Sequence, residues 1–166
     1  MKIILETDRC YLRELTIDDA EKFYELNSDD DVIKYTGDKA FSTISEAKLF
    51  LENYNQYQKH GLGRWAVIDK TTNDFLGWSG LKYSVDLDEV DIGFRFFKKH
   101  WNKGYATETA KACIIYGFEQ FNLSKIVGRA MEDNIASVKV LENIGMAFVK
   151  KMEFELHPGV LYQIEK

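Results

Sequence analysis

The stretch that decides the fold reads Phe94-Arg95-Phe96-Phe97-Lys98-Lys99-His100-Trp101-Asn102-Lys103-Gly104-Tyr105-Ala106-Thr107-Glu108. It begins as a strand, continues as a basic loop and ends in the first turn of a helix. Between Ile92 and Thr107 there are four lysine and arginine residues and no acid. A helix start presents unpaired backbone N–H groups and a partial positive charge, and Gly104 lets an anion approach that backbone closely. The stretch therefore predicts a cradle for a pyrophosphate group.

The segments that flank this loop have clear hydrophobic periodicity. Residues 89–97 alternate as in a strand: apolar side chains share one face, and the other face carries Glu89, Asp91, Gly93 and Arg95. Residues 104–121 repeat apolar side chains at helical spacing. A glycine beside lysines is also typical of an ordinary solvated turn, but its place between this strand and this helix favours the anion cradle.

The same two periodicities predict the other elements. Strands are predicted at residues 10–15, 64–69, 75–83, 125–131, 146–156 and 160–164, and helices at residues 18–26, 43–60 and 134–145. Thr43-Ile44-Ser45-Glu46 has the form of a capping box and starts a helix that continues to about His60. Pro158-Gly159 is predicted to be the turn of the last hairpin.

Length, composition and charge exclude several classes of protein. With 166 residues, 45% of them hydrophobic and 30% charged, the chain is expected to form one domain over residues 1–166. Its net charge of −5 argues against a nucleic-acid partner, because phosphate neutralisation requires an excess of Lys and Arg. The apolar run before Glu6 is only three residues long, Ile3 to Leu5, too short for a signal peptide or a membrane span, so a cytoplasmic protein without a membrane partner is expected.

The two cysteines, Cys10 and Cys113, have apolar neighbours and no Cys-x-x-Cys or Cys/His spacing. This environment is typical of reduced thiols in a core and predicts neither a disulfide nor a metal site.

A second motif, Asn134-Ile135-Ala136-Ser137-Val138-Lys139-Val140-Leu141-Glu142-Asn143-Ile144-Gly145-Met146, follows at the next strand–helix junction. Together with Trp101-Asn102-Lys103-Gly104-Tyr105-Ala106-Thr107-Glu108 it resembles the GCN5-related N-acetyltransferase (GNAT) superfamily, in the branch of the ribosomal-protein alanine N-acetyltransferases. The opening Tyr11-Leu12-Arg13-Glu14-Leu15-Thr16 with Asp19-Ala20 is similar to that branch too. The resemblance covers nearly the whole chain.

The resemblance implies an α+β fold whose mixed, mostly antiparallel sheet is flanked by helices and splayed between two neighbouring strands. It also implies acetyl-CoA as cosubstrate, with its pantetheine arm in the splay against the backbone of Phe94, Arg95 and Phe96. The pyrophosphate would lie on the backbone N–H groups of Trp101, Asn102, Lys103, Gly104, Tyr105, Ala106 and Thr107. Asn134 and Ser137 would face the thiol end of the coenzyme.

The sequence departs from the family pattern at three positions. Asn102 stands where the branch usually has glycine, and Asn143 stands where lysine is common. Leu141 replaces the tyrosine with which many relatives protonate the leaving thiolate. Ser137 is the nearest replacement for that acid, and a water molecule is the other candidate. Asn134 and Ser137 are equally consistent with the cap and first turn of a helix, without any catalytic role.

Glu89 and Asp91 are the candidate general bases, because they share the strand face that should meet the thioester. They are equally typical of solvent-facing strand acids. A protein α-amine with a pKa of about 7.7–8.0 costs only about 1 kcal/mol to deprotonate at pH 7, so a weak base acting through water would suffice. Direct attack of the amine, without a covalent intermediate, is predicted because neither cysteine has a histidine partner.

The acceptor is left open between protein N-termini and small amines such as polyamines, amino sugars or antibiotics. The acidic run Asp29-Asp30-Asp31 is a candidate for attracting a cationic acceptor, although such runs are usually solvated. Tyr54 and Tyr57 are consistent with a homodimer face or with core packing. The alternative to an active enzyme is a coenzyme-A-binding module with weak or no catalysis, which the missing tyrosine permits.

Overall fold

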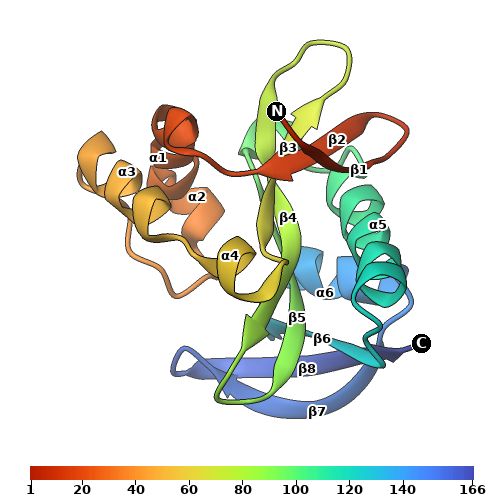
Figure 1. Ribbon diagram of the computed structural model, residues 1–166. Helices are drawn as coiled ribbons and strands as arrows, with labels where there is room; N and C mark the ends of the chain where they lie inside the picture. The colour runs from red at the N-terminus through yellow and green to blue at the C-terminus, as the bar shows by residue number, and fades with distance from the viewer.

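The computed structural model describes residues 1–166 and contains one eight-stranded sheet (Figure 1). The strand order is β1-β2-β3-β4-β5-β6-β8-β7, and every neighbouring pair is antiparallel except β5 and β6. The strands are β1 (Ile3–Glu6), β2 (Cys10–Glu14), β3 (Arg64–Asp69), β4 (Phe75–Ser84), β5 (Glu89–Phe96), β6 (Lys125–Met131), β7 (Ala147–Phe154) and β8 (His157–Glu165). The expected mixed, mostly antiparallel sheet is thereby confirmed, and β1 is a strand that the periodicity did not reveal.

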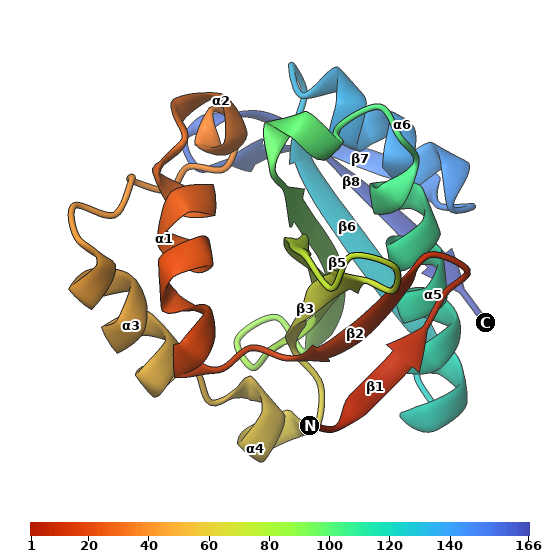
Figure 2. The same ribbon diagram turned by 90° about the horizontal axis from the view of Figure 1, so that it is seen from above.

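Helices cover both faces of the sheet (Figures 1 and 2). On one face lie α1 (Ala20–Ser28), α2 (Asp30–Ile33), α3 (Ile44–Asn53) and α4 (Gln56–His60), and on the other lie α5 (Tyr105–Gln120) and α6 (Ile135–Asn143). Short 3-10 turns at Ile17–Asp19 and Lys98–His100 precede α1 and the long loop before α5. None of the helices combines the length and the apolar character needed to cross a bilayer.

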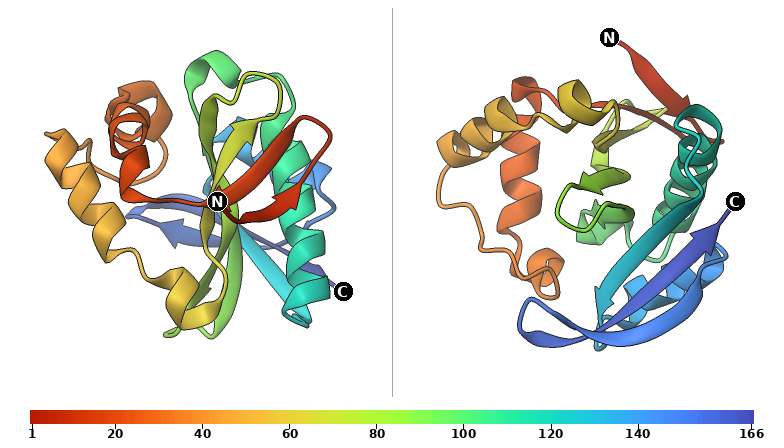
Figure 3. Two further views of the ribbon diagram at one scale, coloured as in Figure 1. Left: turned by 45° about the horizontal axis from the view of Figure 1, so that its top comes forward. Right: turned by 60° about the horizontal axis from the view of Figure 1, so that its bottom comes forward.

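The sheet splays between its two central strands. β5 pairs with β4 along its whole length, from Glu89 opposite Ser84 to Phe96 opposite Gly77. Against β6 it has a single registered pair, Asp91 opposite Val127. Beyond that pair the strands separate, and β6, β8 and β7 turn away from β4 and β5 (Figure 3). The second half of β5 therefore has a free backbone edge, which agrees with the splay implied by the family resemblance.

A separate hydrophobic core fills each face of the sheet. The larger cluster joins the sheet to α5 and α6 and includes Ile92, Phe96, Cys113 and Leu141. A smaller cluster joins the other face to α1 and α3. The predicted alternation of β5 is confirmed, because Val90, Ile92 and Phe96 are buried on the α5 face. The polar residues of β5 consequently lie on the opposite face, where Arg95 reaches Asn27 of α1.

The prediction of one continuous helix over residues 43–60 is wrong, because the chain forms two helices, α3 and α4, with a break at Tyr54. Thr43 caps its start as expected, its Oγ1 accepting from the Glu46 N–H at 3.2 Å. Tyr54 then adopts an extended backbone (φ −74°, ψ 111°) and separates α3 from α4. The break lets the Tyr54 hydroxyl accept from the Arg64 N–H at 2.8 Å, while the Tyr57 hydroxyl donates to the Arg64 carbonyl. Both tyrosines pack inward at the start of β3, which supports core packing over a dimer face.

The last hairpin also turns elsewhere than predicted. Phe154 pairs with His157, so the two-residue turn is Glu155-Leu156, and Pro158 and Gly159 lie within β8. Glu155 and Leu156 have positive φ angles of 47° and 65°. Two consecutive left-handed residues match the twist of a tight hairpin, although Asn-Gly is the usual sequence there. Pairing across the hairpin therefore overrides the preference of Pro-Gly for turns.

Candidate active site

The loop before α5 has the backbone geometry of an anion cradle. Gly104 is the N-cap of α5 with φ +82° and offers no side chain to cap the helix. The first N–H groups of a helix have no partner within it, so those of Tyr105, Ala106 and Thr107 are available to a ligand. Asn102 also has a positive φ, 61°. Asparagine is among the residues that tolerate this conformation best, so its replacement of the family's glycine preserves the loop.

Side chains on both sides hold this loop in place. The Trp101 indole N–H donates to the Phe96 carbonyl at 2.9 Å and ties the loop to the end of β5. Glu108 accepts from the Arg9 backbone N–H at 3.1 Å and from its Nε at 2.7 Å. The Arg9 guanidinium lies 4.1 Å from the centre of the Tyr105 ring. The turn between β1 and β2 thereby fixes the start of α5, which leaves Glu108 a structural role.

The cations of the loop differ in their partners. Lys98 pairs with Asp31 at 2.7 Å, whereas Lys99 and Lys103 have no ion pair in the structure. Burial, followed by the charges of Lys99 and Lys103, lowers the pKa of His100. His100 is therefore neutral at pH 7, and Lys99 and Lys103 are the charges available to phosphate groups.

A cleft of about 210 Å³ opens where β5 and β6 separate, and its walls come from both faces of the sheet. The α5 and α6 side contributes Ile92, Phe94, Ala130, Asn134, Ser137 and Leu141. The α1 and α2 side contributes Tyr35, Thr36, Arg64, Trp78, Asp91, Gly93, Arg95, Arg129 and Phe154. The cleft thus connects the two faces of the sheet beside the free edge of β5. Phe96 is the predicted coenzyme-binding strand residue that lies outside it, buried in the core.

The wall formed by α6 contains the two residues predicted to face the thiol. Asn134 is the N-cap of α6, and its Oδ1 accepts from the Ser137 N–H at 3.3 Å, which confirms the capping interpretation. Leu141 lies one turn further along α6, lines the cleft and is only 2% exposed. Leucine carries no proton to give, so the hydroxyl groups of the cleft are those of Ser137, Thr36 and Tyr35.

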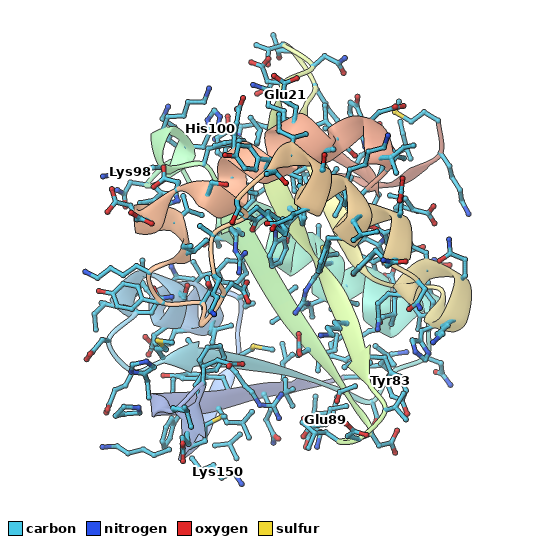
Figure 4. All side chains as sticks on the ribbon, turned by 90° about the vertical axis from the view of Figure 1, so that its left-hand side faces the viewer. Glu21, Tyr83, Glu89, Lys98, His100 and Lys150 are labelled. Atoms are coloured by element: carbon cyan, nitrogen blue, oxygen red, sulfur yellow. The ribbon has the colours of Figure 1, made fainter.

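The two candidate bases occupy different positions. Asp91 lines the cleft, and its Oδ1 accepts from the Arg64 Nη2 at 2.5 Å. Glu89 pairs with Arg129 and is not part of the cleft wall. Figure 4 shows Glu89 at the end of β5 opposite to His100 and the basic loop. Of the two predicted carboxylates, the structure brings only Asp91 to the splay.

Arg95 extends its side chain toward the face of the sheet that α1 covers. Its guanidinium stacks 5.2 Å from the Trp78 ring centre and bonds Asn27 Oδ1 and, at 2.8 Å, Asp38 Oδ2. Arg64 lies on the same ring at 5.5 Å. Burial lowers the pKa of Arg95, but a guanidinium titrates so far above neutrality that it remains charged.

Sequence reasoning missed most of the wall on the α1 and α2 side. These residues come from separate segments with no shared motif: Tyr35, Thr36, Arg64, Trp78, Arg129 and Phe154. Gly93 was one available signal, because a glycine in an alternating strand indicates a close approach. A Cβ there would lie 2.6 Å from the Arg64 Cζ, so only glycine lets that guanidinium cross β5.

Neither cysteine is placed for covalent catalysis. Both thiols are fully buried, and neither lines the cleft. Burial raises the pKa of Cys10 to about 11 and that of Cys113 to about 12, so both are protonated at neutral pH. A thiol without a thiolate form is a poor nucleophile, which supports the predicted absence of a covalent intermediate.

Comparisons with known proteins agree with this geometry. Residues 9–147 match the acetyltransferase (GNAT) domain family. The uncharacterized protein YkkB of Bacillus subtilis is 34% identical over 98% of this chain and 95% of its own length. The crystal structure of a GNAT-family acetyltransferase from Bacillus anthracis superposes with a TM-score of 0.84 at 27% identity, covering 99% of this chain and 98% of that one.

A second similar structure was solved with bound ligands. It is spermidine N-acetyltransferase from Vibrio cholerae, in complex with CoA and spermine, with a TM-score of 0.80 at 20% identity and 95% coverage of both chains. The splayed sheet and the helix that starts beside the splay are shared with these acetyltransferase structures. The chain belongs to the GNAT family and is an acetyltransferase.

Proposed function

We propose that the protein transfers the acetyl group of acetyl-CoA to a primary amine by direct attack. The observation that carries this proposal is the cleft at the splay of β5 and β6, which joins the two faces of the sheet. A thioester reaching it from the α5 side would meet an amine entering from the α1 and α2 side. The sheet spans Ile3 to Glu165, which supports a single catalytic domain over residues 1–166.

The coenzyme would follow the free edge of β5. Its pantetheine amides would pair with the backbone of Phe94, Arg95 and Phe96 along the edge that faces β6, where no strand pairs with them. Its pyrophosphate would accept from the N–H groups at the start of α5, with Lys99 and Lys103 beside it. Its thioester would then lie near Ser137 on α6.

The chemical step forms one bond and breaks one. The nitrogen lone pair attacks the thioester carbonyl, the C–N bond forms, and the C–S bond breaks as the thiolate leaves. The amine loses a proton to Asp91, directly or through water, and the thiolate takes a proton from Ser137, Tyr35 or water. Asp91 is favoured over Glu89 because it is the carboxylate that reaches the cleft. General-base help of this kind is worth about 10²- to 10⁴-fold.

Calorimetric titration of CoA and acetyl-CoA tests the coenzyme site. Wild-type protein is compared with Gly104→Gln and Gly104→Glu, two variants of similar size that place the same strain on a left-handed position. Both should weaken binding, and the charged variant should lose at least a further tenfold, because its carboxylate faces the pyrophosphate. Circular dichroism checks that both variants fold.

Absence of CoA binding to the wild-type protein would overturn the proposal. Equal affinities of the two variants for CoA would contradict the proposed position of the pyrophosphate at the start of α5. Coenzyme binding without acetyl transfer to any amine would instead favour the binding module that lacks catalysis.

A further inference from the structure

The wall on the α1 and α2 side of the cleft, where the amine is proposed to enter, is rich in arginine. Arg64, Arg95 and Arg129 line it with a single carboxylate, Asp91. The side chains of the three arginines are only 18%, 13% and 20% exposed. The carboxylate that balances Arg129 is Glu89, which lies outside the wall. Arg95 is balanced in the same way by Asp38, so each arginine has an ionic partner, but only one of the three partners, Asp91, lies on the wall.

The arginines differ in how many of their donors are used. Arg64 donates to the Gly80 carbonyl, the Asp91 carbonyl and the Asp91 carboxylate. Arg129 makes one hydrogen bond, from Nη2 to Glu89, and its other N–H groups have no protein partner. A guanidinium has five N–H donors in a planar fork that fits carboxylate and phosphate groups. Arg95 donates to Asn27 and Asp38, so Arg129 is the arginine with the most donors left for a ligand.

The size of the cleft limits the acceptor. A volume of about 210 Å³ lies below the range of about 300–1,000 Å³ that is usual for drug-sized ligands. Two segments meet at its rim: Tyr35 to Gly37 after α2, and the tip of the β7–β8 hairpin at Glu155. A Cβ on Gly37 would lie 2.4 Å from the Glu155 Cγ, so these segments are in close contact. This contact leaves room for a small molecule.

We propose that the acceptor is a small amine that also carries an anionic group, a carboxylate or a phosphate, bound by Arg129. The inference rests on the proposed acetyl transfer and narrows its acceptor. The amine would lie toward Asp91 at the splay, and the carbon skeleton would pack on Trp78 and Tyr35. Two acids of the run Asp29-Asp30-Asp31 already have partners within the protein, because Asp29 caps α2 and Asp31 pairs with Lys98.

Matched acceptors test the anionic group. Release of free CoA thiol from acetyl-CoA is measured with phenylalanine against phenylalaninamide, with phosphoethanolamine against ethanolamine, and with spermidine. At least one anionic amine should exceed its neutral partner tenfold or more in kcat/KM, and spermidine should be the poorest acceptor. The pair that shows the difference identifies carboxylate or phosphate as the recognised group. An equal or higher rate with the neutral partners, with spermidine or with a C-terminally amidated peptide would overturn the proposal.

Variants of Arg129 locate the recognition. Arg129→Gln should raise KM for the anionic acceptor at least tenfold more than KM for its neutral partner, whereas Arg129→Lys should recover part of the loss. Lys151→Gln, which changes an exposed pair with Glu132, is the matched surface control. If Arg129→Gln fails to fold, the wild-type acceptor series still decides the matter.

Failure of this inference differs from failure of the proposed function. Failure of the proposed function would appear as absence of CoA binding. Where CoA binds and no acceptor turns over, calorimetric titration of each acceptor into the CoA complex replaces the assay. Equal or absent binding of all the anionic amines there would overturn the acceptor class alone.

Discussion

The proposed coenzyme side and the proposed acceptor side of the cleft are built in different ways. The coenzyme side uses the backbone of one continuous segment, from the free edge of β5 through the left-handed residues Asn102 and Gly104 into α5. The acceptor side uses side chains from β3, β4, β5, β6, the segment after α2 and the β7–β8 hairpin. Backbone recognition depends on local conformation, whereas side-chain recognition depends on the whole fold. The acceptor side can therefore change its ligand without altering the coenzyme site.

The sharpest test of this difference neutralises each of the two carboxylates of β5, Asp91 and Glu89, in separate variants. Asp91→Asn keeps the size of the side chain and an oxygen for Arg64 but removes the charge. It should lower kcat by about 100-fold, which corresponds to about 2.7 kcal/mol, and leave the affinity for CoA unchanged. Glu89→Gln, two residues earlier on the same face, should lower kcat less than threefold. Steady-state kinetics and CoA calorimetry measure both, and a larger effect of Glu89→Gln would move the base to the other carboxylate.

The contrast between the two sides also explains what the sequence could predict. The β5 alternation, the loop, α5 and the Asn134 cap are local patterns, and all appear where expected. Trp78 and Arg129 carry no local signal, because they reach the cleft only through strand pairing across the sheet. The break at Tyr54 was missed for the same reason, since its hydroxyl is bound by β3, ten residues away.

The second prediction concerns the backbone of the coenzyme side. Asn102→Gly should change affinity for acetyl-CoA less than twofold, because glycine adopts the observed positive φ freely. Asn102→Val should weaken binding about tenfold and destabilise the protein by about 1–2 kcal/mol, because a β-branched residue is strained in this conformation. Calorimetry and urea denaturation check the pair. Neither variant should alter the preference among acceptors, and a changed preference would contradict the separation of the two sides.

The cysteines offer a smaller effect, on stability without catalysis. Cys10→Ala and Cys113→Ala each remove one buried sulfur atom and should lower the free energy of unfolding by about 1–2 kcal/mol. kcat should stay within twofold of the wild-type value. Acetylation of either thiol during turnover, detected by mass spectrometry, would refute direct attack.

The smallest effect is expected at His100, which lies in the basic segment between β5 and α5. Burial and the charges of Lys99 and Lys103 lower the pKa of His100 in the folded protein below its ordinary value of 6.5. The unfolded chain then binds a proton more readily, so folding stability is complete above about pH 6.5 and decreases as the pH falls through the lowered folded pKa. His100→Gln should reduce the loss of stability between pH 7.5 and 5.5. Bound CoA should also reduce the loss of stability of the wild-type protein between pH 7.5 and 5.5. Its phosphates would offset the charges of Lys99 and Lys103, which disfavour protonated His100. Urea denaturation at both pH values, with and without CoA, measures the change, and a wild-type pH dependence that CoA leaves untouched would separate His100 from the phosphate site.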